Sequence, residues 1–256
     1  MEGMKINVKG TFLNCDKPTI TAMVQADNPD RIKELIDKCL PEGAEGFGMQ
    51  FEQMKPEYRT KEVYKDLFSY TDKPIYVTNY RLKQNEGKTD DVLAEELLEL
   101  ADCGATLCDI LGDLYDYTPG ELTVNKNAIN KQMTLIDKLH KKGAEVLMSS
   151  HILKFIPAER VLEIALEHQK RGADISKIVT CADTKEQQIE NIRIINMLKE
   201  KLEIPFLFLC NGECHILRRI GGELGCCMYL CVHEYDDFAT QTQPLLKNVK
   251  AIRDNM

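Results

Sequence analysis

Short apolar runs alternate with amphipathic segments along almost the whole chain. Eight of these runs predict strands, because each is bounded by glycine, proline or polar residues. Most of the segments between them carry apolar residues three and four apart, which is typical of a helix that packs on one face. The predicted strands are Thr19–Val24, Gly46–Phe51, Ile75–Asn79, Thr106–Leu111, Glu145–Ser149, Ile175–Thr180, Phe206–Cys210 and Cys226–Val232.

The predicted helices carry recognisable start and stop signals. Asn28-Pro29-Asp30 combines a capping side chain, a first-turn proline and an acidic residue, and Thr184 precedes another apolar series. A glycine ends four of the helices, and each is followed by alanine. This recurrence indicates one strand-and-helix unit used many times. The four glycines are Gly43, Gly104, Gly143 and Gly172.

Eight such units without a long polar linker favour a closed eight-stranded α/β barrel, the TIM barrel, formed as a single domain by residues 1–256. An open doubly wound sheet would carry a glycine-rich phosphate loop after its first strand, and residues 24–28 are not one. Residues 1–17 include an alternating pattern around Gly10. This pattern predicts a short N-terminal β-hairpin that closes the bottom of the barrel.

One predicted strand carries a lysine at its centre. Lys177 shares a strand face with Ile175 and Val179. Burial disfavours the charged form of an amine and lowers its pKa, and a neutral amine is a nucleophile for carbonyl groups. A lysine that extends out at the strand end is the structural alternative.

The strand before Lys177 ends in His151. Strands joined by one helical crossover usually lie side by side and parallel, so this histidine should lie beside Lys177. The carboxyl ends of barrel strands are where enzymes of this fold carry their chemistry. The sequence therefore predicts an amine and a base at one site, with a loop-capping histidine as the alternative.

Further candidates follow the third, seventh and eighth strands. Arg81 is a planar cation suited to a carboxylate, and Glu86 could orient His151 or accept a hydroxyl proton. A solvated loop is the alternative for both. An arginine pair, Arg218-Arg219, lies in a short helical turn after the seventh strand. Residues 238–243 form a loop that could lie over the pocket.

The chain resembles the type I 3-dehydroquinate dehydratases. The motifs that carry the resemblance are Met148-Ser149-Ser150-His151 with Pro157, and Ala173-Asp174-Ile175-Ser176-Lys177-Ile178, at the spacing of that family. The resemblance implies a Schiff base on Lys177, His151 as the proton-transfer group, and conversion of 3-dehydroquinate to 3-dehydroshikimate and water in the shikimate or quinate pathway. It implies no metal and no organic cofactor.

The same resemblance suggests roles for the other candidates. It favours Arg81 as a functional residue, Arg219 as the ligand of the substrate carboxylate, and a glutamine after the eighth strand, Gln241 or Gln243, as a substrate contact. The loop after Arg81 is one residue longer than in the family. Either Asn85 or Glu86 therefore fills the third catalytic position.

The second strand departs from the family pattern. The family has a glutamate and an arginine separated by one residue, which hold the hydroxyl end of the substrate, whereas this chain has Gly48 and Gln50. Met23 stands where the family tends to have serine, and Thr106 and Cys108 replace acidic residues. We expect Gln50 to contact the substrate. Two alternatives stay open: a Schiff-base lyase or aldolase for a different hydroxylated keto acid, and a non-catalytic barrel.

Composition limits the partners and the cellular compartment that we expect for this protein. The net charge of −8 argues against a nucleic-acid partner. Most of the ten cysteines lie in or beside apolar runs, and residues 210–215 with the pair at 226–227 match no usual zinc spacing. The sequence shows no signal peptide and no membrane-spanning run. We expect a cytoplasmic protein with reduced thiols and, from the resemblance, a homodimer.

Overall fold

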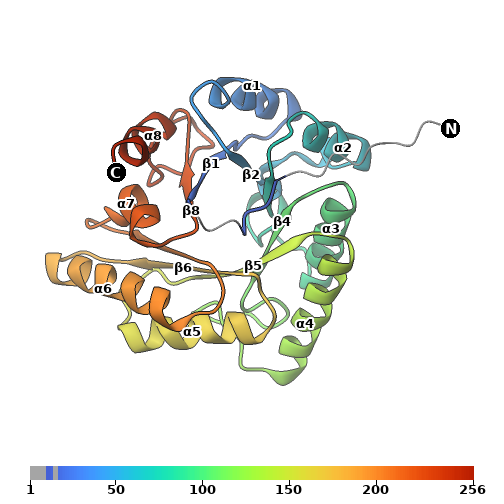
Figure 1. The fold of residues 1–256 in the computed structure, drawn as a ribbon. Coiled ribbons are helices and arrows are strands. Elements are labelled where there is room, and N and C mark those ends of the chain that lie inside the picture. The colour runs from blue at the N-terminus through green and yellow to red at the C-terminus, as the bar shows by residue number, and fades with distance from the viewer. Residues whose placement is uncertain (1–9, 14–16) are drawn as a thin grey trace.

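The computed structural model describes residues 10–13 and 17–256. Its eight parallel strands form one sheet that curls into a ring (Figure 1), which confirms the predicted barrel. Each strand lies within two residues of its predicted bounds. The strands are β1 (Thr19–Met23), β2 (Gly46–Gln50), β3 (Ile75–Thr78), β4 (Leu107–Leu111), β5 (Glu145–His151), β6 (Ile175–Cys181), β7 (Phe206–Asn211) and β8 (Met228–Cys231).

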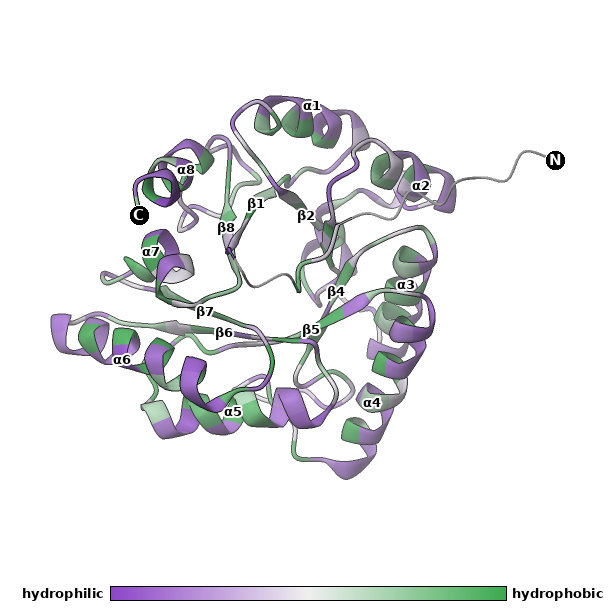
Figure 2. Ribbon diagram, in the orientation of Figure 1, coloured by the Kyte–Doolittle hydropathy of each residue, from purple (hydrophilic) through white to green (hydrophobic). Residues whose placement is uncertain are grey.

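Helices surround the ring, and most helices that follow one another along the chain contact each other. Their apolar faces turn toward the strands and their polar faces outward (Figure 2), as the spacing of apolar residues predicts. The helices are α1 (Pro29–Cys39), α2 (Lys61–Ser69), α3 (Asp90–Asp102), α4 (Lys126–Lys141), α5 (Ala158–Lys170), α6 (Lys185–Lys201), α7 (Leu217–Leu224) and α8 (Leu246–Asp254). Among the residues that the structure describes, no helix combines the length and apolar character needed to cross a membrane.

The predicted start and stop signals act as expected. The side chain of Asn28 accepts a hydrogen bond from the backbone N of Arg31, and Thr184 caps α6 in the same way. The four glycines that precede alanine have positive φ angles of 84–110°. Only glycine adopts this conformation without steric cost, so each ends its helix and returns the chain to the sheet.

The sheet order is β7-β6-β5-β4-β3-β2-β1-β8, so β7 and β8 share no strand ladder. A backbone hydrogen bond of 2.9 Å from the N of Cys227 to the carbonyl of Phe206 links them at the bottom of the barrel. This contact brings the two ends of the sheet together at that point.

Side chains inside the ring fill the lower half of the barrel. Phe12 is fully buried there, and its backbone N donates to the carboxylate of Glu145 at the start of β5. A side chain at Gly46 would come within 2.9 Å of the Phe12 ring. Phe12 thus covers the bottom, while most of the predicted hairpin falls on residues 1–9 and 14–16, outside the described residues.

Candidate active site

A cavity of about 810 Å³ opens at the carboxyl ends of the strands. Each of the eight strands contributes at least one side chain to its lining, and the loop after β8 adds more. Lys177 and His151 both belong to this lining. The structure therefore brings together the two residues that the sequence singled out first.

Lys177 points into the ring and its side chain is 6% exposed. Its Nζ donates to three groups: the hydroxyl of Tyr76 at 3.0 Å, the hydroxyl of Tyr80 at 2.9 Å and Oδ2 of Asp109 at 3.1 Å. The sequence indicated only the burial of this amine and not its carboxylate partner.

Asp109, on β4, is the fully buried partner of this lysine. Burial alone would raise the pKa of its carboxyl, but the charge of Lys177 and hydrogen bonds from three hydroxyls outweigh burial and lower that pKa. Those hydroxyls belong to Ser149, Tyr76 and Tyr80. Burial also raises the pKa of both tyrosines well above the ordinary value, so both remain proton donors.

His151 lies one step farther along the same face. In the β5–β6 ladder Ser149 pairs with Lys177, and His151 pairs with Val179, so His151 is the diagonal neighbour of Lys177. The rings of Tyr80 and His151 meet edge to face with centroids 5.4 Å apart. Because the Tyr80 hydroxyl also contacts Lys177, this tyrosine joins the amine to the imidazole.

A carboxylate contacts the imidazole, but it does not belong to the loop after Arg81, where Asn85 or Glu86 was expected. Nδ1 of His151 lies 2.7 Å from Oε2 of Glu121, in the loop between β4 and α4. Glu86 is exposed and lies outside the cavity lining. Asn85 is fully buried and donates to the Asn79 side chain and to the Tyr80 carbonyl. A short 3-10 turn over Lys83–Asn85 accommodates the extra residue and leaves Glu86 at the surface.

Arg81 lines the cavity, yet its guanidinium is occupied. It forms two hydrogen bonds with the carboxylate of Asp90 and two with Asp113, one to the side chain and one to the carbonyl. These contacts leave little of Arg81 for a substrate carboxylate. Its role as a substrate ligand stays a prediction that the geometry does not favour.

Of the arginine pair, Arg218 lines the cavity and Arg219 does not. Arg218 is 6% exposed and donates to the carbonyl of Cys210 and the side chain of Asn211. Burial lowers the pKa of Arg218 to about 10, which leaves it charged at neutral pH. Among the described residues it has no carboxylate partner, so it is an uncompensated buried cation.

The loop after β8 covers the cavity with Gln243 rather than Gln241. Gln241 is exposed and donates to carbonyls of its own loop. Gln243 is 5% exposed, lines the cavity, and its Oε1 has no hydrogen-bond partner. Gln50 lines the cavity as expected, and its Oε1 accepts from Gln25 at 2.6 Å.

Gly48 and Met23, two departures from the family pattern, are physically linked. A Cβ at position 48 would lie 2.2 Å from the sulfur of Met23 and 3.1 Å from the Tyr76 ring. The methionine therefore occupies the space that any side chain at position 48 would need. The cavity wall is apolar at this point.

A second carboxyl reaches the cavity from just beyond β2. Glu52 is buried and accepts from the Thr78 hydroxyl at 3.0 and 2.9 Å. Burial raises the pKa of Glu52 to about 6, and the nearby charge of Asp109 adds to this effect. Such a carboxyl exchanges a proton close to neutral pH.

Sequence reasoning missed Asp109, Glu121, Arg218 and Glu52. Asp109 carried a usable signal, because it is a charge at the centre of an apolar strand, as Lys177 is. Glu121 carried none, because it lies in a loop without periodicity. Among residues 10–13 and 17–256, no three His, Cys, Asp or Glu side chains are arranged to hold a metal ion.

Comparisons with known proteins agree with the fold. The family model for type I 3-dehydroquinase matches residues 22–232. A curated 3-dehydroquinate dehydratase from Alkaliphilus oremlandii is 32% identical over 93 residues, a match that spans 36% of each chain.

Two solved structures show the same barrel. The 3-dehydroquinate dehydratase from Geobacillus kaustophilus has a TM-score of 0.78 at 14% identity, over 94% of this chain and 91% of that one. The type I enzyme from Clostridium difficile, solved with covalently modified comenic acid, has a TM-score of 0.76 at 16% identity, over 93% and 92%. At these identities the likeness is one of fold.

Proposed function

The chain belongs to the type I 3-dehydroquinase family, a family of hydro-lyases, and from this premise we propose that it dehydrates 3-dehydroquinate to 3-dehydroshikimate through a Schiff base on Lys177. The observation that carries this proposal is that Lys177, buried inside the barrel, opens onto the same cavity as His151. Either residue alone would have a structural explanation. Their shared cavity supplies a nucleophile and a base to one small molecule.

The buried cluster suggests how the amine becomes reactive. Lys177 forms an ion pair with Asp109, and an amine held in an ion pair must give up a proton before it can attack a carbonyl. Asp109 and the two tyrosine hydroxyls lie within hydrogen-bond distance of Nζ and offer a route for that proton. The neutral amine then adds to the ring ketone, and loss of water gives an iminium.

The iminium makes the neighbouring C–H acidic. His151 removes that proton and returns it to the β-hydroxyl, which leaves as water. Hydrolysis of the conjugated imine releases the enone and restores Lys177. No part of this sequence requires a bound metal or an organic cofactor.

The proposed binding mode follows the charges in the cavity. Arg218, a buried cation without a carboxylate partner, is the group best placed to take the substrate carboxylate. Glu52 and Gln50 face the cavity from the β2 side, where the family's own acid and base are missing. We assign them, with Gln243, to the hydroxyl end of the substrate.

The direct test is to add 3-dehydroquinate to the purified protein and follow the absorbance of the conjugated enone product. Growth of that absorbance, abolished by Lys177→Met, is the expected result. No enone with the wild-type protein at any pH between 5 and 9 would remove 3-dehydroquinate as the substrate.

A second candidate is dehydration or aldol cleavage of a different hydroxylated keto acid. The packing of Met23 against Gly48 favours it, because an apolar wall replaces an acidic one. A panel of keto acids that differ in hydroxylation, tested with borohydride for imine formation, separates this candidate from the first.

We also propose that the protein is a single-domain cytoplasmic homodimer. Apart from Cys227, eight of the described cysteines carry free thiols, which suits a reducing compartment. On α6, Ile189 and Ile192 are 66% and 37% exposed, three residues apart, and provide an apolar surface for a second copy. Light scattering of wild-type protein and Ile189→Glu tests the oligomer.

A further inference from the structure

The contact between Glu121 and His151 determines which ring nitrogen is the base. Oε2 of Glu121 lies 2.7 Å from Nδ1 and 2.6 Å from the backbone N of the same histidine. An ionised carboxylate only accepts hydrogen bonds, so Nδ1 carries a proton and Nε2 of the neutral ring is free. We propose that Glu121 is the positioning residue for His151, a role that the third-strand loop was expected to provide. This inference rests on the proposed function.

The backbone at Glu121 is held in an unusual conformation. Its φ of 45° is uncommon for a residue with a side chain. The hydroxyl of Ser150, the neighbour of His151, donates to the Glu121 carbonyl at 2.6 Å. A Cβ at Gly112 would lie 2.6 Å from this carbonyl oxygen, so the close approach requires glycine there. The end of β5 and the β4–α4 loop are therefore locked together.

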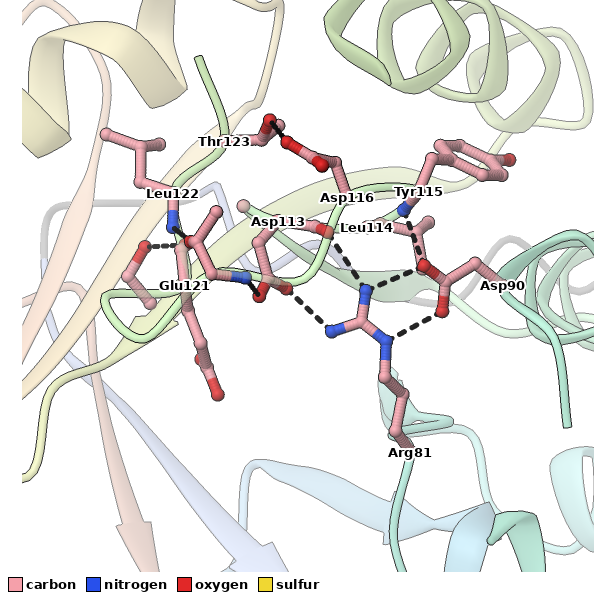
Figure 3. Close-up of polar contacts among 12 residues, drawn as sticks. Arg81, Asp90, Asp113, Leu114, Tyr115, Asp116, Glu121, Leu122 and Thr123 are labelled. Carbon is pink, nitrogen blue, oxygen red and sulfur yellow. Dashed lines mark hydrogen bonds and ion pairs between the residues drawn. The ribbon is translucent and has the colours of Figure 1, made fainter. Parts of the chain in front are cut away.

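Arg81 supports this loop from the side of β3 (Figure 3). Its guanidinium lies between Asp90 at the start of α3 and Asp113 in the loop. The second oxygen of Asp113 accepts from the backbone N of Thr118 at 2.8 Å, and the Thr118 carbonyl accepts from the N of Glu121 at 3.0 Å. A continuous series of hydrogen bonds thus runs from Arg81 to Glu121.

Arg171 fixes both ends of the loop from below. It is 3% exposed and donates to the carbonyl of Gly112 at 2.8 Å and to that of Thr123 at 2.6 Å. The side chain of Gln132 donates to the same Gly112 carbonyl. Two arginines, the buried Arg171 and the half-buried Arg81, therefore hold the loop that presents one carboxylate. This arrangement explains why Arg81 is not free for a ligand.

The first test needs no substrate. Nitrogen-15 NMR of the His151 ring should show the Nδ1–H tautomer in the wild-type protein. Glu121→Ala should lose that preference, whereas Glu121→Gln should keep it, because an amide oxygen still accepts from Nδ1. An exposed α5 variant, Glu163→Gln, controls for general effects.

The rival assignment, in which Glu86 positions His151, gives the opposite pattern. If Glu121→Ala leaves the tautomer of His151 unchanged, or if Glu86→Gln alters it, the proposal is overturned. These readouts decide the role of Glu121 even if 3-dehydroquinate proves not to be the substrate.

The second test uses turnover. Glu121→Ala should lower kcat about 10²- to 10⁴-fold with little change in KM, because it disables the base and not substrate binding. Borohydride trapping at Lys177 should persist in this variant. If the wild-type protein is active and Glu121→Ala has the same kcat, the proposal for Glu121 is contradicted. If the wild-type protein itself is inactive, the proposed function is contradicted instead.

Discussion

Nζ of Lys177 lies 3.1 Å from Oδ2 of Asp109, and the hydroxyls of Tyr76 and Tyr80 contact both groups. The reactive amine is therefore one member of a buried ion pair rather than an isolated neutral base. This pair and the two hydroxyls fix the position of the Lys177 side chain inside the barrel. Disruption of the pair should affect both stability and chemistry.

We expect Asp109→Asn to destabilise the protein by about 3–5 kcal/mol at neutral pH, because it leaves a buried charge without its partner. Urea denaturation measures this loss. Asp91→Asn is the matched control, since Asp91 pairs with Lys131 at the surface, where such pairs contribute at most about 1 kcal/mol. Equal stability of the Asp109 variant and the wild-type protein would show that the pair has no structural role.

We expect His151→Ala to separate imine formation from elimination. In this variant borohydride should still trap the imine on Lys177. Turnover should fall about 10²- to 10⁴-fold, because the proton-transfer group is gone. His140→Ala serves as the control, since His140 pairs with Asp174 outside the cavity lining. Retained turnover in His151→Ala would exclude this histidine from the reaction.

The two neighbouring arginines give a sharp comparison. Arg218→Ala should reduce kcat/KM by a factor that corresponds to about 2–5 kcal/mol, mainly through KM, because a buried cation faces the substrate carboxylate. Arg219→Ala should have a much smaller effect, since Arg219 lies outside the cavity lining. Steady-state kinetics of both variants measures this difference. The reverse order would support the sequence-based assignment of Arg219.

The raised pKa of Glu52, about 6 against an ordinary 4.5, predicts a pH-dependent stability. The folded state binds this proton more tightly than the unfolded chain does. The free energy of unfolding should therefore fall by about 2 kcal/mol between pH 4.5 and pH 6 and then level off. Denaturation of Glu52→Gln across this range should lack that component. If the free energies of unfolding of the wild-type protein and Glu52→Gln changed with pH in parallel, a group other than Glu52 would be responsible.

Local sequence signals were enough to predict the fold. Each strand combines an apolar run with a bounding turn signal, and glycines such as Gly43 have the positive φ angles that end helices. These signals depend on a few adjacent residues. Asp109, like Lys177, is a charged residue at the centre of an apolar strand. The reasoning that identified Lys177 could therefore have predicted this ion pair as well.

The rest of the site depends on contacts distant in sequence. Glu121 meets His151 across 30 residues, and its loop is shaped by Arg81 and Arg171 from other elements. The choice between Arg218 and its neighbour depends on where α7 begins, which no periodicity fixes within one residue. A comparison of motifs places Glu86 in the site. The extra residue after Arg81 instead leaves Glu86 at the surface.

The central claim is that Lys177 forms an imine with the substrate ketone. Borohydride reduction in the presence of 3-dehydroquinate, followed by proteolysis and mass spectrometry, tests it directly. We predict a stable adduct, with the mass of the reduced imine, on the peptide that contains Lys177, and no adduct in Lys177→Met. An adduct on a different lysine, or enone formation without any trapped adduct, would contradict the account.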